Sequence, residues 1–443
     1  MTVAAPPLSL VEAAAIPVVP QEDKVTSIDI GRQLFVDDYL IKDTTLKRTF
    51  HQANLYADAP ILKPETKLER EGGTAEGAVL FDGGVWFDPK DQLFKIWYTC
   101  GFRDGICYAS SKDGIRWDRP QLDVSPGENR VLPYHKGWEL SGFSVALDQF
   151  TSDPAQRFKM LAYHRYKNRF PGDKGEENPP DKMYVSADGI HWGEPQFVKC
   201  FVGDNASMFF DPFRRYWVFS TRNRTPGLSG RRGSNGKPVT VRARFRFEGP
   251  DFLQAGLTAN KALLWLKADA LDKPDPALGY EPEIYTFGAV AYESIMLGAY
   301  GMFYGPPNDI AGTKGKERPK INDVQLGFSR DGVAYPRPSR TAFIAAARQP
   351  GVWNRGYRRR ESRGMVRGWR LRRAHVLHHA GVLPGPQRLG EAEQGSGWRG
   401  GPGTVCRALR HGVNSISRRQ AQVRRGQGHR PAWQRGDAGP HAR

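Results

Sequence analysis

The stretch SKDGIRW, residues 111–117, recurs along the chain with only small changes. It returns as SADGIHW at residues 186–192 and as SRDGVAY at residues 329–335. The second interval is about twice the first, which indicates a repeat of about 70 residues with one degenerate copy. That copy is expected near residue 250, where RARFRFEGPDF, residues 242–252, keeps an alternating strand pattern but has lost the Asp-Gly pair.

Three segments of similar sequence lie before or between these copies, at residues 84–101, 144–164 and 207–221. Each segment has an apolar run, a polar turn and an aromatic-rich run, which predicts a β-hairpin. A third strand follows as ICYASS or KMYVSA. Units of three or four antiparallel strands, arrayed radially, make the blades of a β-propeller. The Asp-Gly pair then supplies a tight turn with positive φ, and the aromatic residue after it fills space between blades.

Helical periodicity is weak before residue 340. KALLWLKADALD, residues 261–272, is interpreted as one or two helical turns in an insertion. The predicted fold class is therefore all-β, a five-bladed propeller over residues 28–345 whose last blade is incomplete.

The formal net charge of +18 is unevenly spread over the 443 residues. Residues 1–350 hold 45 basic and 43 acidic residues, whereas residues 351–443 hold 20 arginines, no lysine and four acids. The main part of the chain is thus nearly neutral, and we expect no nucleic-acid partner for it.

The four cysteines lack the spacing of a zinc site. Cys100 and Cys107 flank GFRDGI, so they face each other across strands if this is a hairpin turn. Two free buried thiols are the favoured interpretation, since cysteine is a common core residue.

Residues 1–27 have no basic segment before their apolar run and are broken by prolines, so we interpret them as a flexible leader rather than a signal peptide or a membrane span. Export stays open if the coding sequence begins upstream.

Several motifs together resemble a known family: RQLFVDDYLI (32–41), TFHQA (49–53), FKIWY (94–98), YASSKDGIRW (108–117) and AVAYESIMLG (289–298). They are similar to bacterial five-bladed propellers related to glycosyl hydrolase families 32 and 43, the superfamily of invertases, levansucrases and arabinanases. The Asp-box of six-bladed sialidases is the second-ranked resemblance. The invertase-type signatures W-x-N-D-P-N-G, R-D-P and E-C are absent.

The resemblance implies a funnel at the propeller axis, with three acids near the innermost strands that cleave glycosidic bonds of an oligo- or polysaccharide. Two carboxylates flank the bond in opposite protonation states, and a third charge separates their pKa values. Acids in suitable places are Asp37, Asp38, Asp82, Glu139, Asp204 and Glu293. Of these, the predicted catalytic residues are Glu293, Asp204, Asp38, Asp37 and Asp82. Asp88 and Asp211, before prolines, are expected in hairpin turns.

Aromatic and histidine side chains are the candidates for stacking on or binding sugar: Trp86, Trp138, Tyr292 and His51. We expect no cofactor, no metal and no membrane partner. The alternatives are a non-catalytic carbohydrate-binding or scaffold propeller, and a glycoside phosphorylase, which needs a basic cluster beside the acids.

The composition changes in residues 346–443. From residue 351 on, phenylalanine and lysine both vanish and strand alternation ends. Four interpretations compete: a shift of reading frame in a GC-rich gene, a disordered basic arm, a nucleic-acid-binding segment, and a compact basic domain. The frame shift is favoured because a selected basic arm usually contains lysine. It also begins where the fifth blade is due, and a chain so truncated is expected to be unstable or inactive.

Overall fold

The computed structural model describes residues 28, 32–54, 60–73, 75–132, 138–166, 181–232, 236–306, 320–349 and 352. Their regular structure is almost entirely β, with two short α-helices, α1 (Lys67–Glu71) and α2 (Phe252–Thr258), and one 3-10 turn at Pro154–Gln156. Within these ranges, no helix is long and apolar enough to cross a membrane.

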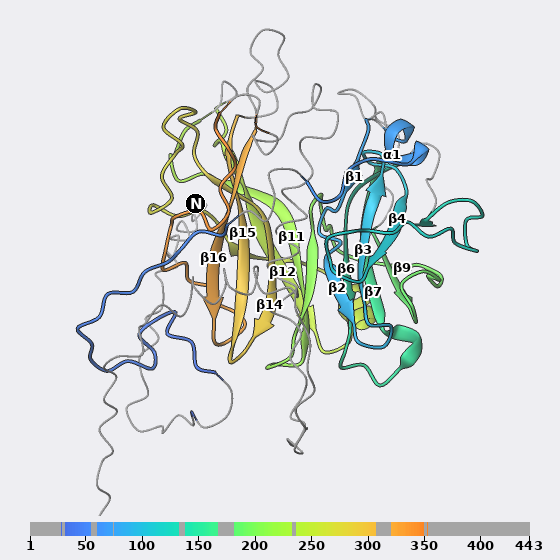
Figure 1. The fold of residues 1–443 in the computed structure, drawn as a ribbon. Coiled ribbons are helices and arrows are strands. Elements are labelled where there is room, and N and C mark those ends of the chain that lie inside the picture. Colours follow the sequence, from blue (N-terminus) through green and yellow to red (C-terminus); the bar gives the residue numbers. More distant parts are fainter. Residues whose placement is uncertain are drawn as a thin grey trace, which may run out of the picture.

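The strands of the described ranges form four antiparallel sheets (Figure 1). The first contains β1 (Ala78–Val79), β2 (Val85–Asp88), β3 (Leu93–Cys100), β4 (Ile106–Ser111) and β5 (Arg130–Leu132). The second contains β6 (Trp138–Leu147), β7 (Phe158–Tyr166), β8 (Lys182–Ser186) and β9 (Gln196–Phe197). The third contains β10 (Ser207–Asp211), β11 (Tyr216–Pro226), β12 (Thr240–Gly249) and β13 (Leu263–Leu266). The fourth contains β14 (Glu283–Tyr292), β15 (Ile295–Gly305) and β16 (Ile321–Ser329). The three hairpins predicted from the sequence are confirmed.

Strands β2, β6, β10 and β14 follow one another around a common axis. Asp82, just before β2, forms a parallel bridge with Ser144 of β6. The hydroxyl of Ser144 accepts a hydrogen bond from the backbone of Met208 in β10 at 3.3 Å. The hydroxyl of Ser207 donates to the carbonyl of Phe287 in β14. With first strands inside and later strands outside, the sheets are the blades of a β-propeller, as the sequence predicts.

Large apolar side chains fill the wedges between neighbouring sheets. Trp97 of the first sheet meets Phe158 of the second, with ring centroids 5.4 Å apart. Phe209 of the third sheet meets Phe287 of the fourth at 6.3 Å. A further buried cluster around Phe219 joins the second and third sheets. Aromatic pairs of this kind stabilise by about 0.5–1.5 kcal/mol beyond their buried area.

The face of the fourth sheet that is turned away from the third is covered by two segments distant in sequence. Leu34 and Val36 pack there with Phe343 and Ile344, and Ile344 bridges to Val324 of β16. Of the predicted basic tail, residues 346–443, the structure describes residues 346–349 and 352; the rest of the tail lies outside the described residues.

The three Asp-Gly motifs form the same turn after β4, β8 and β16. Gly114, Gly189 and Gly332 have φ of 72°, 82° and 69°. In each copy the serine hydroxyl accepts the glycine N–H at 2.8–2.9 Å. One oxygen of the aspartate accepts two backbone N–H groups at 2.8–2.9 Å. The prediction of equivalent structural turns is confirmed.

The third sheet replaces this turn with a helix. Strand β12 ends at Gly249 and is followed by α2, whose N-cap Asp251 accepts the N–H of Gln254 at 2.8 Å. The helical turns predicted in residues 261–272 are wrong, because Leu263–Leu266 pair with β12 as β13. Pairing at a sheet edge overrides the local helical preference of this segment.

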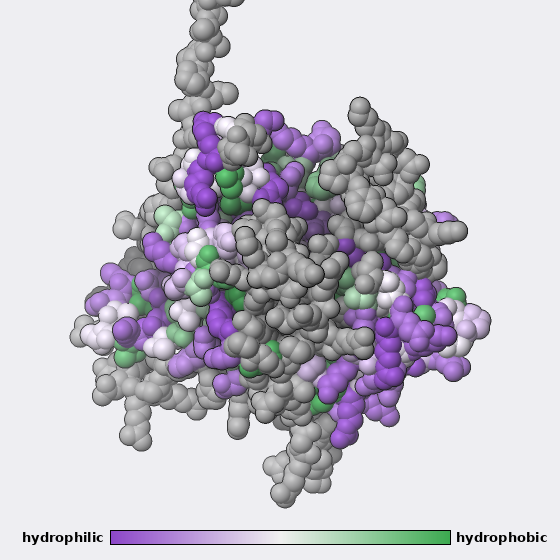
Figure 2. Space-filling model, turned by 90° about the horizontal axis from the view of Figure 1, so that it is seen from above, coloured by the Kyte–Doolittle hydropathy of each residue, from purple (hydrophilic) through white to green (hydrophobic). Residues whose placement is uncertain are grey.

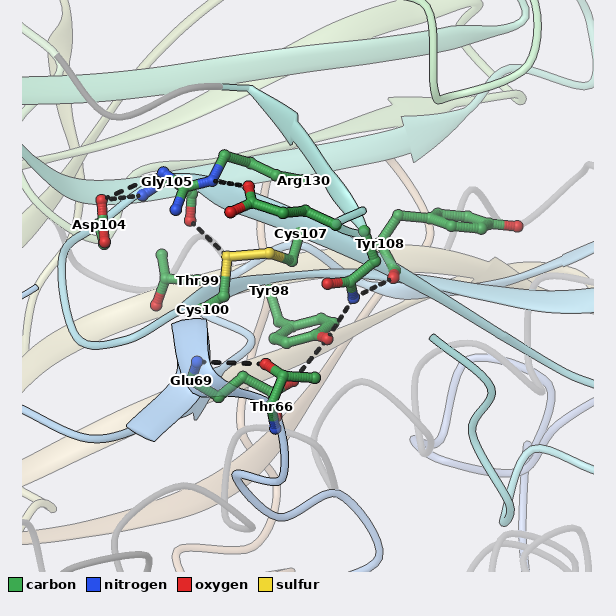
Figure 3. Close-up of a disulfide and its surroundings, with 12 residues drawn as sticks. Thr66, Glu69, Tyr98, Thr99, Cys100, Asp104, Gly105, Cys107, Tyr108 and Arg130 are labelled. Atoms are coloured by element: carbon green, nitrogen blue, oxygen red, sulfur yellow. Dashed lines mark hydrogen bonds and ion pairs between the residues drawn. A yellow bond between two sulfur atoms is a disulfide. The ribbon is translucent and has the colours of Figure 1, made fainter. Parts of the chain in front are cut away.

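Cys100 and Cys107 are joined by a disulfide, so the expectation of two free thiols is wrong (Figure 3). Strands β3 and β4 make a hairpin in which Tyr98 stands opposite Cys107. The two cysteines are therefore diagonal neighbours, with Cα atoms 5.7 Å apart, within the range that a disulfide spans. Buried cysteines are often free, but here the turn GFRDGI between the two strands brings Cys100 and Cys107 close enough to be joined.

Candidate active site

The inner strands of all four sheets run in the same direction along the axis. Their first residues therefore lie at one end of the propeller, and the turns that follow them lie at the other end. We call the end where β2, β6, β10 and β14 begin the upper end, as it is drawn in Figure 1, and the opposite end the lower end. The hairpin turns after the inner strands and the Asp-Gly turns lie at the lower end. Candidate residues can therefore be sorted by the end at which they lie.

Asp82 lies on the axis at the upper end. Positive φ values at Phe81 (48°) and Gly84 (71°) bend the chain on either side of it. Its N–H donates to the carbonyl of Phe143 at 3.1 Å, and one carboxylate oxygen is buried. A bend rather than a regular strand thus places this carboxylate beside the second blade.

Asp204 lies at the same end, in the turn that precedes β10. Gly142 of β6 is so close that a Cβ there would come within 2.8 Å of the Asn205 nitrogen. The carboxylate of Asp204 forms an ion pair with Arg222 of β11. Glu139 is the second residue of β6. Asp82 is therefore level with Ser144 of β6 and Asp204 is close to the level of Gly142, whereas Glu139 precedes both of these β6 residues.

Asp37 and Asp38 lie elsewhere. The carboxylate of Asp37 accepts hydrogen bonds from Arg330 at 2.8 and 3.1 Å, and Arg330 belongs to the last Asp-Gly turn, at the lower end. Asp38 is largely exposed and pairs with Arg48. The structure does not bring these two acids to Asp82 and Asp204.

Glu293 occupies the turn between β14 and β15, also at the lower end, with a φ of 54°. Its side chain is 6% exposed and pairs with Arg32, which is 53% exposed. In the other blades the corresponding turns begin with Asp88, Asp148 and Asp211, each of which accepts a backbone N–H two residues on at 2.9–3.0 Å. Glu293 belongs to this series of turn carboxylates, and the structure does not bring it to Asp204.

Removing the two partners of the Glu293–Arg32 pair should have unequal effects on stability. Arg32→Gln leaves a buried carboxylate without its cation, whereas Glu293→Gln leaves an arginine that water still solvates. We expect Arg32→Gln to lower the free energy of unfolding by about 2 kcal/mol or more and Glu293→Gln by about 1 kcal/mol or less. Urea unfolding of both variants measures the order, and the reverse order would contradict this placement.

The four predicted sugar-binding residues are divided in the same way. The indole N–H of Trp86 donates to the carbonyl of Val145 at 2.8 Å, on the axis between the first two blades. Trp138 is the first residue of β6, at the upper end. Tyr292 ends β14 at the lower end, and His51 is exposed in the segment over the fourth sheet. Of the four, Trp86 lies close to Asp82, because the two contact adjacent residues of β6, Val145 and Ser144.

A group of arginines on β11 and β12 was not among the site residues predicted from the sequence. Arg222 pairs in register with Arg244, and Arg224 with Arg242, so all four point to one face of the third sheet. The signal was present, because STRNRTP and VRARFRF both place arginine at every second position.

Asp181, a buried carboxyl just before β8, was also not predicted from the sequence. One oxygen accepts the N–H of Val202 at 3.1 Å, and the other has no hydrogen-bond partner in the described part of the chain. Burial raises the pKa of Asp181 to about 7, although the hydrogen bond from Val202 opposes the shift. Burial, with the nearby Asp181 charge, also raises the pKa of the Cys200 thiol to about 11.

The protein should therefore lose stability as pH rises from about 4 to 7. In this window the folded state holds a proton that Asp181 has released in the unfolded chain, so the free energy of unfolding falls by up to about 4 kcal/mol. Asp181→Asn should remove most of this fall. Urea unfolding at pH 5 and pH 8 measures it, with Asp43→Asn, at an exposed site, as the control. Equal slopes in wild type and Asp181→Asn would contradict the prediction.

No three His, Cys, Asp or Glu side chains gather as a metal site among the residues that the structure describes.

No protein-family model matches the chain, and no curated protein matches it. Solved structures similar to it include an N-acetylgalactosamine deacetylase from F. plautii in complex with blood group B trisaccharide, at 13% identity over 68% of this chain and 76% of the other, with a TM-score of 0.39. A fructofuranosidase from Schwanniomyces occidentalis complexed with fructose has 13% identity over 60% and 47%, with a TM-score of 0.37. A GH43 protein from Bacillus licheniformis has 12% identity over 62% and 44%, with a TM-score of 0.39.

The chain spans less than half of the length of the last two proteins. Similarities at this level carry no argument about activity. The propeller fold rests on the sheet order and on the contacts along the axis.

Proposed function

We propose that the protein cleaves glycosidic bonds of an oligo- or polysaccharide with carboxylates at the upper end of the propeller axis. The observation that carries this proposal is that both acids flank β6: Asp82 lies against Ser144, and Asn205, the residue after Asp204, lies against Gly142. Glycosidic cleavage needs two carboxylates that flank the bond in opposite protonation states. The resemblance of the sequence to propeller glycosidases supports the same assignment.

The two acids lie in different surroundings. Asp204 has the guanidinium of Arg222 beside it. Asp82 stands next to Phe81, which is buried in the core between the first two blades. Cleavage needs one carboxylate as general acid and one as base or nucleophile, and we assign these two roles to Asp82 and Asp204.

Product analysis on a panel of aryl glycosides and defined oligosaccharides tests the proposal. We expect release of free sugar by the wild-type protein and its loss in Asp82→Asn. Binding of a sugar without any product would replace the proposal with a non-catalytic carbohydrate-binding propeller. A sugar phosphate formed only when inorganic phosphate is present would replace hydrolysis with phosphorolysis.

A further inference from the structure

The hairpin of β11 and β12 carries a charge unlike that of the rest of the described chain. Residues 216–249 contain eight basic residues and one acid, Glu248. The basic residues are Arg222, Arg224, Arg231, Arg232, Lys237, Arg242, Arg244 and Arg246. The upper part of this hairpin rises beside Asp204, so its charge lies at the proposed active site.

Part of this charge is neutralised locally. Arg222 pairs with Asp204, and Arg242 pairs with Glu283 at 2.6 Å. Arg244 is fully buried and donates to the carbonyl oxygens of neighbouring strands, among them that of Tyr285 at 2.9 Å. These three arginines therefore have structural partners.

Arg224 differs from them. Its guanidinium donates to the hydroxyl of Thr240 at 2.8 Å and to the carbonyl of the same residue. No carboxylate pairs with it among the described residues. Desolvation lowers the pKa of Arg224, the nearby carboxylate of Glu283 opposes this shift, and the charges of Arg242 and Arg222 add to it. The side chain is exposed, so an anion from solution can reach its guanidinium group and pair with it.

The loop that joins β11 to β12 adds exposed cations to the same region. Arg231 and Arg232 are exposed, and the backbone of Arg231 is fixed by a hydrogen bond from Val239 at 2.7 Å. Lys237 is exposed as well. Figure 2 looks onto the upper end and shows hydrophilic residues over much of its coloured surface.

We propose that Arg224, with Arg231, Arg232 and Lys237, binds an acidic substituent, a carboxylate or a sulfate, on the saccharide whose glycosidic bond lies at Asp204. The inference rests on the proposed function and adds a substrate class to it. A guanidinium group binds both anions through paired hydrogen bonds. Arg224 lies two residues beyond Arg222, or about 7 Å along the strand. That separation suits a group on the sugar chain, since a phosphate co-substrate must lie at the reacting carbon itself.

Binding measured without turnover tests the inference. The protein is Asp82→Asn, titrated calorimetrically with an oligogalacturonide and with the same oligosaccharide after reduction of its carboxyl groups. A sulfated galactan oligosaccharide and its desulfated form make the second pair. Inorganic phosphate and a single-stranded oligonucleotide are titrated as further ligands. Arg224→Gln is the test variant, Arg224→Lys retains the charge, and Lys112→Gln removes one exposed charge at the lower end.

We expect one acidic ligand to bind at least about tenfold more tightly than its neutral partner, since hydrogen bonds to charged groups are worth this much. Arg224→Gln should remove that preference, Arg224→Lys should restore part of it, and Lys112→Gln should leave it intact. Equal binding of acidic and neutral partners would overturn the inference, as would tightest binding of phosphate or of the oligonucleotide. If the acid preference holds but no glycoside is ever cleaved, the anion site stands and the proposed hydrolysis falls. If neutral glycosides are cleaved without any acid preference, the reverse applies.

Discussion

Gly189→Ala should lower the free energy of unfolding by about 3 kcal/mol or more. Gly189 has a φ of 82°, and an L-residue in that conformation costs about 1–2 kcal/mol. A Cβ at this position would also overlap the ring of Trp97, and overpacking adds about 1–3 kcal/mol. The glycine cannot retreat, because its carbonyl accepts the indole N–H of Trp97 at 2.7 Å. The Asp-Gly turn of the second blade is thereby fixed to the first.

Gly127 provides a matched control. It has the same φ of 82°, but a Cβ there would meet nothing within 4 Å. Gly127→Ala should therefore cost only the conformational part, about 1–2 kcal/mol. Urea unfolding of both variants separates the two contributions. Equal losses would show that the Asp-Gly turns are local features without a role in joining blades.

Asp82→Asn should reduce glycoside turnover by a factor of about 10² or more, the usual effect of losing a general acid or base. Asp204→Asn should have an effect of similar size, since both carboxylates must act on one bond. Asp123→Asn is the control, because Asp123 also forms a charged contact, with His191 at 3.0 Å, but it is exposed and lies between the outer strands β4 and β5. An unchanged rate in Asp82→Asn would remove Asp82 from the site.

The propeller architecture was predictable because short local sequence patterns determine its turns and hairpins. SKDGIRW and its copies specify a turn through three or four adjacent residues. In the hairpins before them, apolar and polar residues alternate with the period of two that is typical of a strand. Only the segment after β12 departed from the pattern, and its replacement by α2 follows from the loss of the Asp-Gly pair. The edge strand β13 was missed because its partner is more than 15 residues away in the sequence.

The site was less predictable because it depends on the end of the propeller at which each acid lies, and the sequence of a strand does not show this. The pattern of AVAYESIML predicts one continuous strand, because the segment contains no Gly, Pro, Asn or Asp that would indicate a turn. Glu293 takes a positive φ without being glycine, and β14 therefore ends at Tyr292, just before this residue. A comparison with FDP and LDQ at the ends of β2, β10 and β6 would have shown that Glu293 continues a series of turn acids.

The position of Asp37 illustrates the same limit. FVDDY resembles a strand in sequence, but residues 37–40 form bends and a turn, and the acid is held by an arginine nearly 300 residues away. Such a pairing has no local signature. The arginines of β11 and β12, in contrast, were visible as an alternating pattern, and only their position beside Asp204 required the structure.

The most direct test of the central claim, that carbohydrate is processed at the upper end, is a crystal structure of Asp82→Asn with an oligosaccharide from the product screen. We expect a sugar ring at the starts of β2 and β10, with its glycosidic oxygen within hydrogen-bond distance of the substituted side chain at position 82 or of the Asp204 carboxylate. A sugar bound instead at the lower end, beside Glu293 or the Asp-Gly turns, would contradict the account.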